Sequence, residues 1–139
     1  MKREVRTIQE LAWLYAGLFF FVVLLGYIPA FNDEQGLLFG LFKIDPIDDI
    51  LHLASGIWAA FAAWHSLKYS VFYFKAFGIL YCLDGLIGLI FGNGYLDLAI
   101  FLNGPAVLDF GTKIAINTPH ILIGGLAAFL GFRLSKKFK

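Results

Sequence analysis

The sequence is poor in charge, in cysteine and in recognisable catalytic motifs. Only 15% of its 139 residues are charged, whereas an average soluble domain has about 25%. The single cysteine, Cys82, excludes a disulfide within the chain. The 11 basic residues form only short clusters, so nothing indicates a nucleic-acid-binding surface. No phosphate-binding loop, nucleophile elbow or metalloprotease helix is present, which favours a protein without catalytic activity.

Apolar residues make up most of the remaining sequence. They account for 60% of the chain, which contains 16 Phe, 6 Tyr and 3 Trp. A soluble domain of this size leaves much of its surface in water and could not bury so much apolar area. A lipid bilayer removes that difficulty, and aromatic side chains suit its headgroup region. We therefore expect a single integral membrane domain over residues 1–139.

Four apolar stretches approach the length of about 20 residues that a transmembrane helix requires. Pro29 closes the first, Asp45 and Pro46 open the second, and Asn117 with Pro119 opens the fourth. These signals predict an all-α membrane protein. Its four transmembrane helices are expected to form a bundle over residues 11–28, 47–64, 72–91 and 117–134.

Lysine and arginine are distributed unevenly around the four stretches. If all four span the membrane, nine basic residues fall on one side, and Lys43 and Lys113 fall on the other. Basic residues are enriched on the cytoplasmic side of membrane proteins. We therefore expect both termini in the cytoplasm, including a basic tail at residues 135–139, and the two longer loops outside.

The two outer loops contain apolar runs, at residues 36–42 and 98–102, that are too short to span a bilayer. Such runs either lie in the membrane interface or fold back as re-entrant segments, which need protein or water around their backbone. We favour the interface, and the re-entrant arrangement stays open as the alternative.

Two segments of the chain are similar at a fixed offset of 68 residues. Residues 49–61 and 117–129 share His, Gly, Ala, Ala and Phe, and Gly17 matches Gly85 at the same offset. A duplicated helical hairpin explains this pattern, and chance is the alternative because Ala and Phe are common in membrane helices. Repeat 1 would cover residues 11–66 and repeat 2 residues 72–134, related by an axis along the membrane normal.

Small residues recur at spacings of three and four along the expected helices, which places them on shared helix faces. Glycine and alanine let helix backbones approach closely in lipid, where no hydrophobic force drives association. We expect these faces to form the inner seams of the bundle. The residues expected at the seams are Gly17, Gly56, Ala60, Gly85, Gly88, Gly124 and Ala128.

Three ionisable residues, His52, Asp84 and His120, lie inside the expected spans. At 1.5 Å per residue, Asp84 and His52 lie roughly 10 and 7 Å from the outer boundary, at similar depth. Ionisable residues are costly in lipid and normally face the bundle interior with a partner. We expect these three to form an intramembrane polar network with Asp49 and Asn117.

This network has several interpretations. The simplest is a set of interhelical hydrogen bonds that fixes how the hairpins dock, each worth about 0.6–2 kcal/mol. Paired histidines on facing helices could instead bind haem, with His52 and His120 as axial ligands. The two histidines and a carboxylate could bind a metal, although no dense ligand spacing assigns one. Asp84 could also serve proton or ion transport.

Short motifs at residues 25–29, 40–44 and 49–56 resemble those of a known family. They read LGYIP, GLFKI and DILHLASG, and Asn117, Thr118 and His120 match a second motif that opens the family's last helix. Asn117 and His120 are closer together here than in that motif. The chain is similar to the bacterial four-span membrane family known as domain of unknown function 4383. The resemblance implies a four-span bundle in a bacterial inner membrane and brings no established activity.

The leading interpretation is a non-enzymatic structural or accessory subunit of the membrane, without a cofactor. Its expected partners are the lipid bilayer and either further copies of itself or a larger membrane complex. Two alternatives from other classes stay open. One is a haem- or metal-binding redox module that uses His52 and His120, and the other is a small proton or ion transport or sensing protein that uses Asp84.

Overall fold

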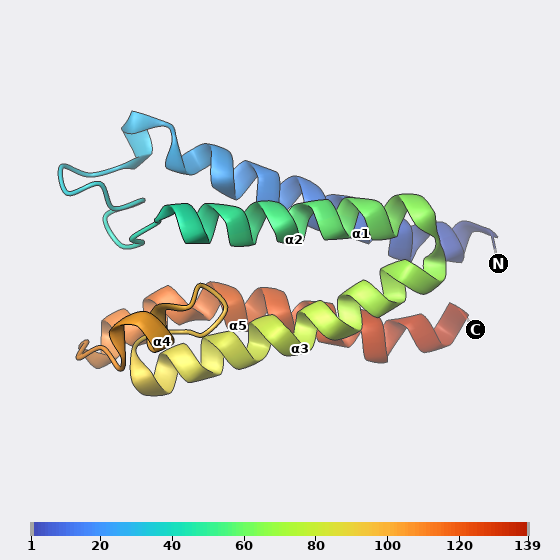
Figure 1. Ribbon diagram of the computed structural model, residues 1–139. Coiled ribbons are helices and arrows are strands. Elements are labelled where there is room, and N and C mark those ends of the chain that lie inside the picture. Colours follow the sequence, from blue (N-terminus) through green and yellow to red (C-terminus); the bar gives the residue numbers. More distant parts are fainter. Residues whose placement is uncertain (1, 139) are drawn as a thin grey trace.

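The computed structural model describes residues 2–138, which form helices and turns and, apart from isolated bridges, no strand. The all-α prediction is therefore confirmed. Two antiparallel helical hairpins lie side by side (Figure 1): α1 (Lys2–Gly26) packs along α2 (Pro46–His65), and α3 (Leu67–Phe91) packs along α5 (Phe110–Phe132). The long loops lie at one end of the molecule, and the start of α1 and the end of α5 lie at the other.

Shorter elements complete the structure. The α1–α2 loop contains the 3₁₀ turn η1 (Pro29–Phe31), followed by tight turns in which Leu38 is buried. The α3–α5 loop contains the five-residue helix α4 (Ala99–Asn103). A second 3₁₀ turn, η2 (Leu134–Phe138), follows α5. The apolar runs of both loops therefore fold into compact turns at the same end of the bundle (Figure 1).

Side-chain caps determine where three of the long helices begin. Asp45 caps α2 in a reciprocal capping box with Asp48. Ser66 ends α2 and also caps α3, so a single residue separates these two helices. Asp109 caps α5 by accepting a hydrogen bond from the backbone N–H of Thr112.

The last long helix begins earlier than the sequence predicts. The predicted start at Asn117 is wrong, because Asp109 caps a helix that starts at Phe110, and Pro119 lies inside it. Asn117 and Thr118 each donate a side-chain hydrogen bond to the carbonyl four residues earlier, as polar residues do within a helix. A proline usually marks a helix start because it lacks an N–H, and here that signal was misleading.

Three helical segments are long and apolar enough to cross a membrane: Arg6–Gly26, Leu67–Phe91 and Phe110–Lys137. Large apolar side chains stand exposed on each of them, among them Leu14 and Phe129. The fourth long helix, α2, is more polar, because two aspartates lie in its first turn and histidine lies in its last. These helices are compatible with a membrane protein, as the composition predicts.

Aromatic side chains of α3 form the contact between the two hairpins. Tyr73, Phe74 and Phe77 are almost completely buried, and the ring of Tyr15 from α1 meets all three edge-on. Edge-to-face pairs of this kind stabilise by about 0.5–1.5 kcal/mol beyond the burial of their area. The core is therefore aromatic, and it holds α1 against α3 across the hairpin boundary.

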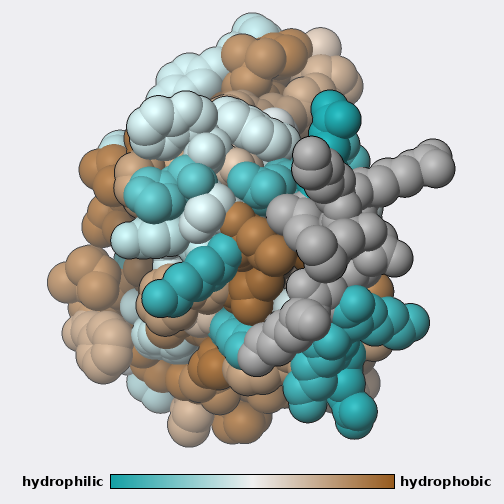
Figure 2. Space-filling model, turned by 90° about the vertical axis from the view of Figure 1, so that its right-hand side faces the viewer, coloured by the Kyte–Doolittle hydropathy of each residue, from teal (hydrophilic) through white to brown (hydrophobic). Residues whose placement is uncertain are grey.

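Charge is divided between the two ends of the bundle. Figure 2 faces the end where α1 begins, and it shows hydrophilic side chains gathered around that end. The loop end and the helix starts beside it carry seven of the ten acidic residues. The exposed basic residues of the opposite end are Arg6, Lys68, Arg133, Lys136 and Lys137.

Candidate functional site

The polar site lies towards the loop end of the bundle and is centred on Asp84 of α3, which is 4% exposed. Its Oδ1 accepts hydrogen bonds from the backbone N–H groups of Tyr95 and Leu96, both at 2.8 Å. Its Oδ2 is hydrogen-bonded to Nδ1 of His120 on α5. Both carboxylate oxygens are therefore engaged, and the α3–α5 loop is tied to the two helices that it connects.

Gly94 allows the loop to approach this carboxylate. A Cβ added at residue 94 would lie 2.5 Å from Oδ1 of Asp84, closer than real Cβ contacts. The Tyr95 hydroxyl adds a hydrogen bond to the carbonyl of Leu80 at 2.8 Å. Sequence reasoning missed the loop as a partner of Asp84, because backbone amides leave no side-chain signal. Gly94 is the residue that could have indicated the close approach.

The two histidines meet at the boundary between the hairpins. The ring centroids of His52 on α2 and His120 on α5 are 6.5 Å apart, with the rings nearly perpendicular. Phe19 stacks on His52, and Tyr81 contacts His120. Nδ1 of His52 is enclosed and has no hydrogen-bond partner among the described residues. The structure therefore brings His52, Asp84 and His120 together, but only Asp84 and His120 are bonded directly.

Two tyrosine hydroxyls connect the hairpins near this cluster. The Tyr81 hydroxyl of α3 lies 2.6 Å from Oγ of Ser55 on α2, and the Tyr15 hydroxyl of α1 donates to the carbonyl of Ile123 on α5 at 3.0 Å. Ser55 donates its own proton to the carbonyl of Leu51, so Tyr81 is the donor in the first bond. Sequence reasoning missed Ser55, since a serine in an apolar helix does not reveal its partner.

Asp49 and Asn117 lie outside this cluster, although the sequence predicts a network of all five residues. Asp49 accepts a hydrogen bond from the Tyr27 hydroxyl at 2.8 Å, at the loop end of the first hairpin. Asn117 is buried between α3 and α5, where an added Cβ on Gly88 would collide with its amide. Each precedes its histidine by three residues, which places it about 4.5 Å nearer the loops along the helix.

Most of the expected small residues of the second hairpin lie where α3 and α5 approach closely. An added Cβ at Gly85 would lie 2.5 Å from the side chain of Ile121, and one at Gly124 would collide with the backbone of α3. Gly78, which the sequence did not single out, lies against the backbone of Ala128. The seam between these two helices is therefore a backbone-to-backbone contact.

The first hairpin uses its small residues differently. Gly56 of α2 packs against Phe20 of α1, and Ala60 is half-buried beside the core. Gly17 is exposed, and an added Cβ there would meet nothing within 4 Å. Gly17 therefore does not lie at a seam within this chain, because α1 turns the face that carries Ala12 and Ala16 inward.

Metal binding finds no support in the geometry. Within the part of the chain that the structure describes, no three His, Cys, Asp or Glu side chains converge in a group that could hold a metal ion. His52, His120 and Asp84 are close in space, but the carboxylate is already bonded to the loop and to His120. The cluster is therefore a hydrogen-bonded site at the junction of three helices.

The acids of the α3–α5 loop differ in how readily they ionise. Burial raises the pKa of Asp97, whose carboxylate accepts a hydrogen bond from the N–H of Ala99. Hydrogen bonds from the side chain and backbone of Thr112 lower the pKa of Asp109. Asp109 thus stays charged at the start of α5, where the helix dipole favours an anion, while ionisation of Asp97 opposes the folded loop.

Comparison with known proteins supplies a family and no activity. Neither a curated protein nor a solved structure matches this chain. The family model described as domain of unknown function (DUF4383) matches residues 9–133. That range includes all of α2, α3 and α5, the part of α1 from Gln9 onward, and every residue of the polar site. The chain therefore belongs to the DUF4383 family, as its motifs predict.

Proposed function

We propose that this chain is a bacterial inner-membrane protein with four transmembrane helices, which serves as a non-enzymatic structural or accessory subunit. Three of its helices are long and apolar enough to cross a membrane, and α2 is the proposed fourth span. The polar residues of α2 lie mainly in its first and last turns, at Asp48, Asp49 and His65. Polar side chains at such positions reach the interface, and α2 packs along α1.

The distribution of charge supports a cytoplasmic location for both termini. Exposed basic residues gather at the end where α1 starts and α5 stops, and most acidic residues lie at the loop end. Figure 2 shows the hydrophilic side chains of the first of these ends. Cytoplasmic flanks of membrane helices are rich in lysine and arginine. Cysteines placed at residue 34 and at residue 137 in a Cys82→Ala background would test this. A membrane-impermeant maleimide should label only the former in intact cells.

The main support for a structural role is that both carboxylate oxygens of Asp84 are hydrogen-bonded within the protein. An ionisable residue inside a membrane bundle marks either a transport pathway or an internal bond. Here two loop N–H groups and the His120 imidazole engage both carboxylate oxygens. A carboxylate that carried protons or ions would have to release these partners in each cycle. Fixed internal bonds instead favour a clamp that closes the loop end of the second hairpin.

The bonds between the hairpins support the proposed duplication. Ser55 and Ile123 occupy equivalent positions at the offset of 68 residues, and each accepts a tyrosine hydroxyl from the opposite hairpin. The two histidines at the same offset meet face to edge at the hairpin boundary. The two tyrosines are not equivalent, because the offset pairs Tyr15 with Leu83 and Tyr81 with Trp13. The matched acceptor positions and the paired histidines are what support two parallel repeats around an axis along the membrane normal.

Reconstitution of the wild-type protein and an Asp84→Asn variant in liposomes would test the proposed role. A clamp predicts that wild-type protein adds no proton or ion flux above empty liposomes, and that the variant melts at a lower temperature. Flux through the wild type that disappears in an equally stable variant would assign Asp84 to transport and overturn the structural role. Cross-linking in native membranes would show whether the proposed subunit associates with copies of itself.

A haem-binding redox module is the second candidate, favoured by the two histidines that face each other from different hairpins. Their ring centroids are 6.5 Å apart, and histidine is a common axial ligand of haem iron. Asp84 would orient His120, as carboxylates commonly orient ligating histidines. A visible absorption spectrum of protein from haem-replete cells tests this directly. A coloured wild type and a colourless His52→Phe variant would establish haem, and a colourless wild type would exclude it.

A further inference from the structure

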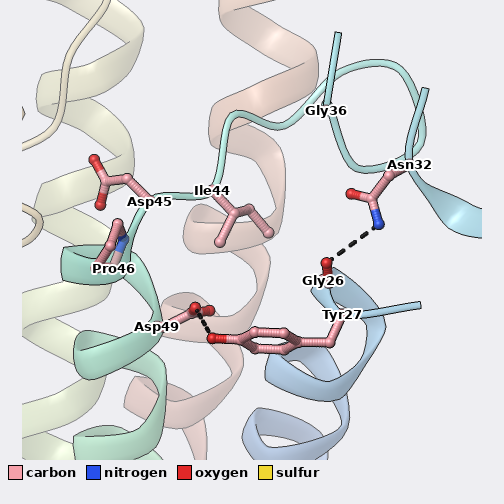
Figure 3. A pocket seen from close by; sticks show the side chains of 8 residues that line it. All are labelled: Gly26, Tyr27, Asn32, Gly36, Ile44, Asp45, Pro46 and Asp49. Carbon is pink, nitrogen blue, oxygen red and sulfur yellow. Dashed lines mark hydrogen bonds between the residues drawn. The ribbon is translucent and has the colours of Figure 1, made fainter. Parts of the chain in front are cut away.

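A small cavity opens at the loop end of the first hairpin, away from the Asp84 cluster (Figure 3). Its volume is about 250 Å³, and its lining comes from the end of α1, the α1–α2 loop and the first turn of α2. A water molecule occupies about 30 Å³ in the liquid, so the cavity has room for an organic group of several heavy atoms. Tyr27, Asn32, Ile44, Pro46 and Asp49 are the lining residues whose chemistry matters here.

The polar side chains of this cavity offer acceptors. Oδ2 of Asp49 accepts the Tyr27 hydroxyl at 2.8 Å and keeps a second lone pair, whereas Oδ1 is sealed off from the cavity by protein atoms. The amide nitrogen of Asn32 is committed, because it donates to the carbonyls of Gly26 and Ile28 at 3.2 and 2.9 Å. Its amide oxygen is left as a second acceptor. A ligand that satisfies these groups must donate hydrogen bonds.

The charge of Asp49 is also left without a counter-ion in the cavity lining. Asp45 and Asp48 bond to the N-terminus of α2 and to each other's backbone in the capping box. Asp49 takes no part in that cap, and no lysine or arginine lines the cavity. A carboxylate in a recess gains most from a cationic partner that can also donate hydrogen bonds.

We propose that this cavity binds a primary ammonium group. Asp49 is the counter-ion, the oxygens of Asn32 and Tyr27 are further acceptors, and Ile44 and Pro46 contact the carbon chain of the ligand. A divalent metal fits less well, since Asp49 is the one lining carboxylate outside the helix cap and two apolar side chains line the space. A quaternary ammonium has no N–H group, so it would leave the acceptors unsatisfied.

The surroundings of the cavity favour a lipid headgroup as the source of the amine. Exposed aromatic side chains, Tyr27, Phe31 and Phe39, lie on and beside its lining. Aromatic residues concentrate at the level of the lipid headgroups, and phosphatidylethanolamine presents a primary ammonium there. This assignment of source rests on the proposed membrane topology. The ammonium chemistry itself rests only on the cavity.

Titration of the full-length protein in detergent micelles tests the ammonium chemistry. Ethanolammonium chloride should raise the melting temperature, whereas tetramethylammonium chloride at equal ionic strength should not. Asp49→Asn should weaken ethanolammonium binding by about tenfold or more, as expected for the loss of a charge-assisted hydrogen bond. The asparagine can still accept the Tyr27 hydroxyl, so the fold is retained, and the melting temperature without ligand verifies this.

Glu34→Gln is the matched control, because it removes one negative charge from the same loop at an exposed residue outside the lining. It should leave the affinity unchanged. Equal responses to the two ammonium salts, or equal ethanolammonium affinity of the wild type and Asp49→Asn, would overturn the proposal.

Native mass spectrometry of protein released from nanodiscs distinguishes the two sources. Asp49-dependent retention of phosphatidylethanolamine over phosphatidylcholine and phosphatidylglycerol assigns the site to lipid. Ethanolammonium binding without such retention assigns it to a soluble amine. Failure of the proposed topology in the maleimide experiment would leave the detergent titration intact, so the two proposals can fail separately.

Discussion

Replacing Gly94 with alanine would test whether the bond to Asp84 holds the α3–α5 loop in place. The new Cβ would lie 2.5 Å from Oδ1 of Asp84, so the loop must move outward by about 1 Å to reach an ordinary contact. The 2.8 Å hydrogen bonds from Tyr95 and Leu96 would then lengthen to about 3.8 Å, beyond hydrogen-bonding range. Each bond to a charged acceptor is worth about 1.5–3 kcal/mol, so the loop should lose about 3 kcal/mol.

Amide hydrogen exchange of the protein in nanodiscs measures this loss at the two residues concerned. A loss of about 3 kcal/mol corresponds to exchange at Tyr95 and Leu96 that is about a hundredfold faster. Gly17→Ala is the matched control, because the same substitution on exposed α1 meets no atom within 4 Å. It should leave both amides unchanged and stabilise α1 by about 1 kcal/mol through helix propensity. Unchanged protection of the two amides in Gly94→Ala would refute the clamp.

Three further predictions concern packing, hydroxyl bonds and pH. Gly124→Ala should lower the melting temperature by separating α5 from the backbone of α3, whereas Gly125→Ala, which has open space around it, should not. Tyr81→Phe should destabilise by about 1 kcal/mol in reversible unfolding, since it removes a bond between hairpins. Tyr73→Phe should instead be neutral or stabilising, because the buried Tyr73 hydroxyl has no partner among the described residues. The raised pKa of Asp97 means that the folded state binds this proton more tightly than the unfolded state does. The protonated Asp97 side chain therefore stabilises the fold fully below the unfolded pKa of about 3.9, and this stabilisation is lost as the pH rises through the folded pKa. Asp97→Asn should flatten that part of the curve of melting temperature against pH, and an unchanged slope would contradict the assignment.

The helices of this protein could be predicted because their signals are local. Long apolar stretches and the Asp45 cap are properties of neighbouring residues, and α2 follows them closely. The predicted spans also lie within or beside α1 and α3, but these helices begin nine and five residues before residues 11 and 72. The start of α5 was misplaced because Pro119 gives a start signal, whereas Asp109, eight residues before Asn117, caps the helix. Asp109 and Pro119 are both residue types that commonly start helices. Which of them starts this helix depends on how the preceding loop folds, and the sequence does not show that.

The candidate site could be predicted only in part. His52, Asp84 and His120 converge, because ionisable residues at similar depth in a bundle turn away from lipid. The further partners of Asp84 are backbone amides, and a sequence does not show which loop folds back over a helix end. Asp49 was assigned to the same network, but its partner is Tyr27, because both lie at the loop end of the first hairpin.

The sequence by itself determined that this chain forms apolar helices suited to a membrane, with a few ionisable residues that require internal partners. Hydropathy, length and the cost of unpaired charge in lipid suffice for that inference. Only the tertiary structure decided that His120 and the loop amides engage Asp84, that Gly17 faces outward, and that Asp49 lines a cavity that contains no basic side chain. These features depend on how α1 and α5 are rotated about their axes and on how the loops fold back. Both are outcomes of packing, which sequence spacing alone does not specify.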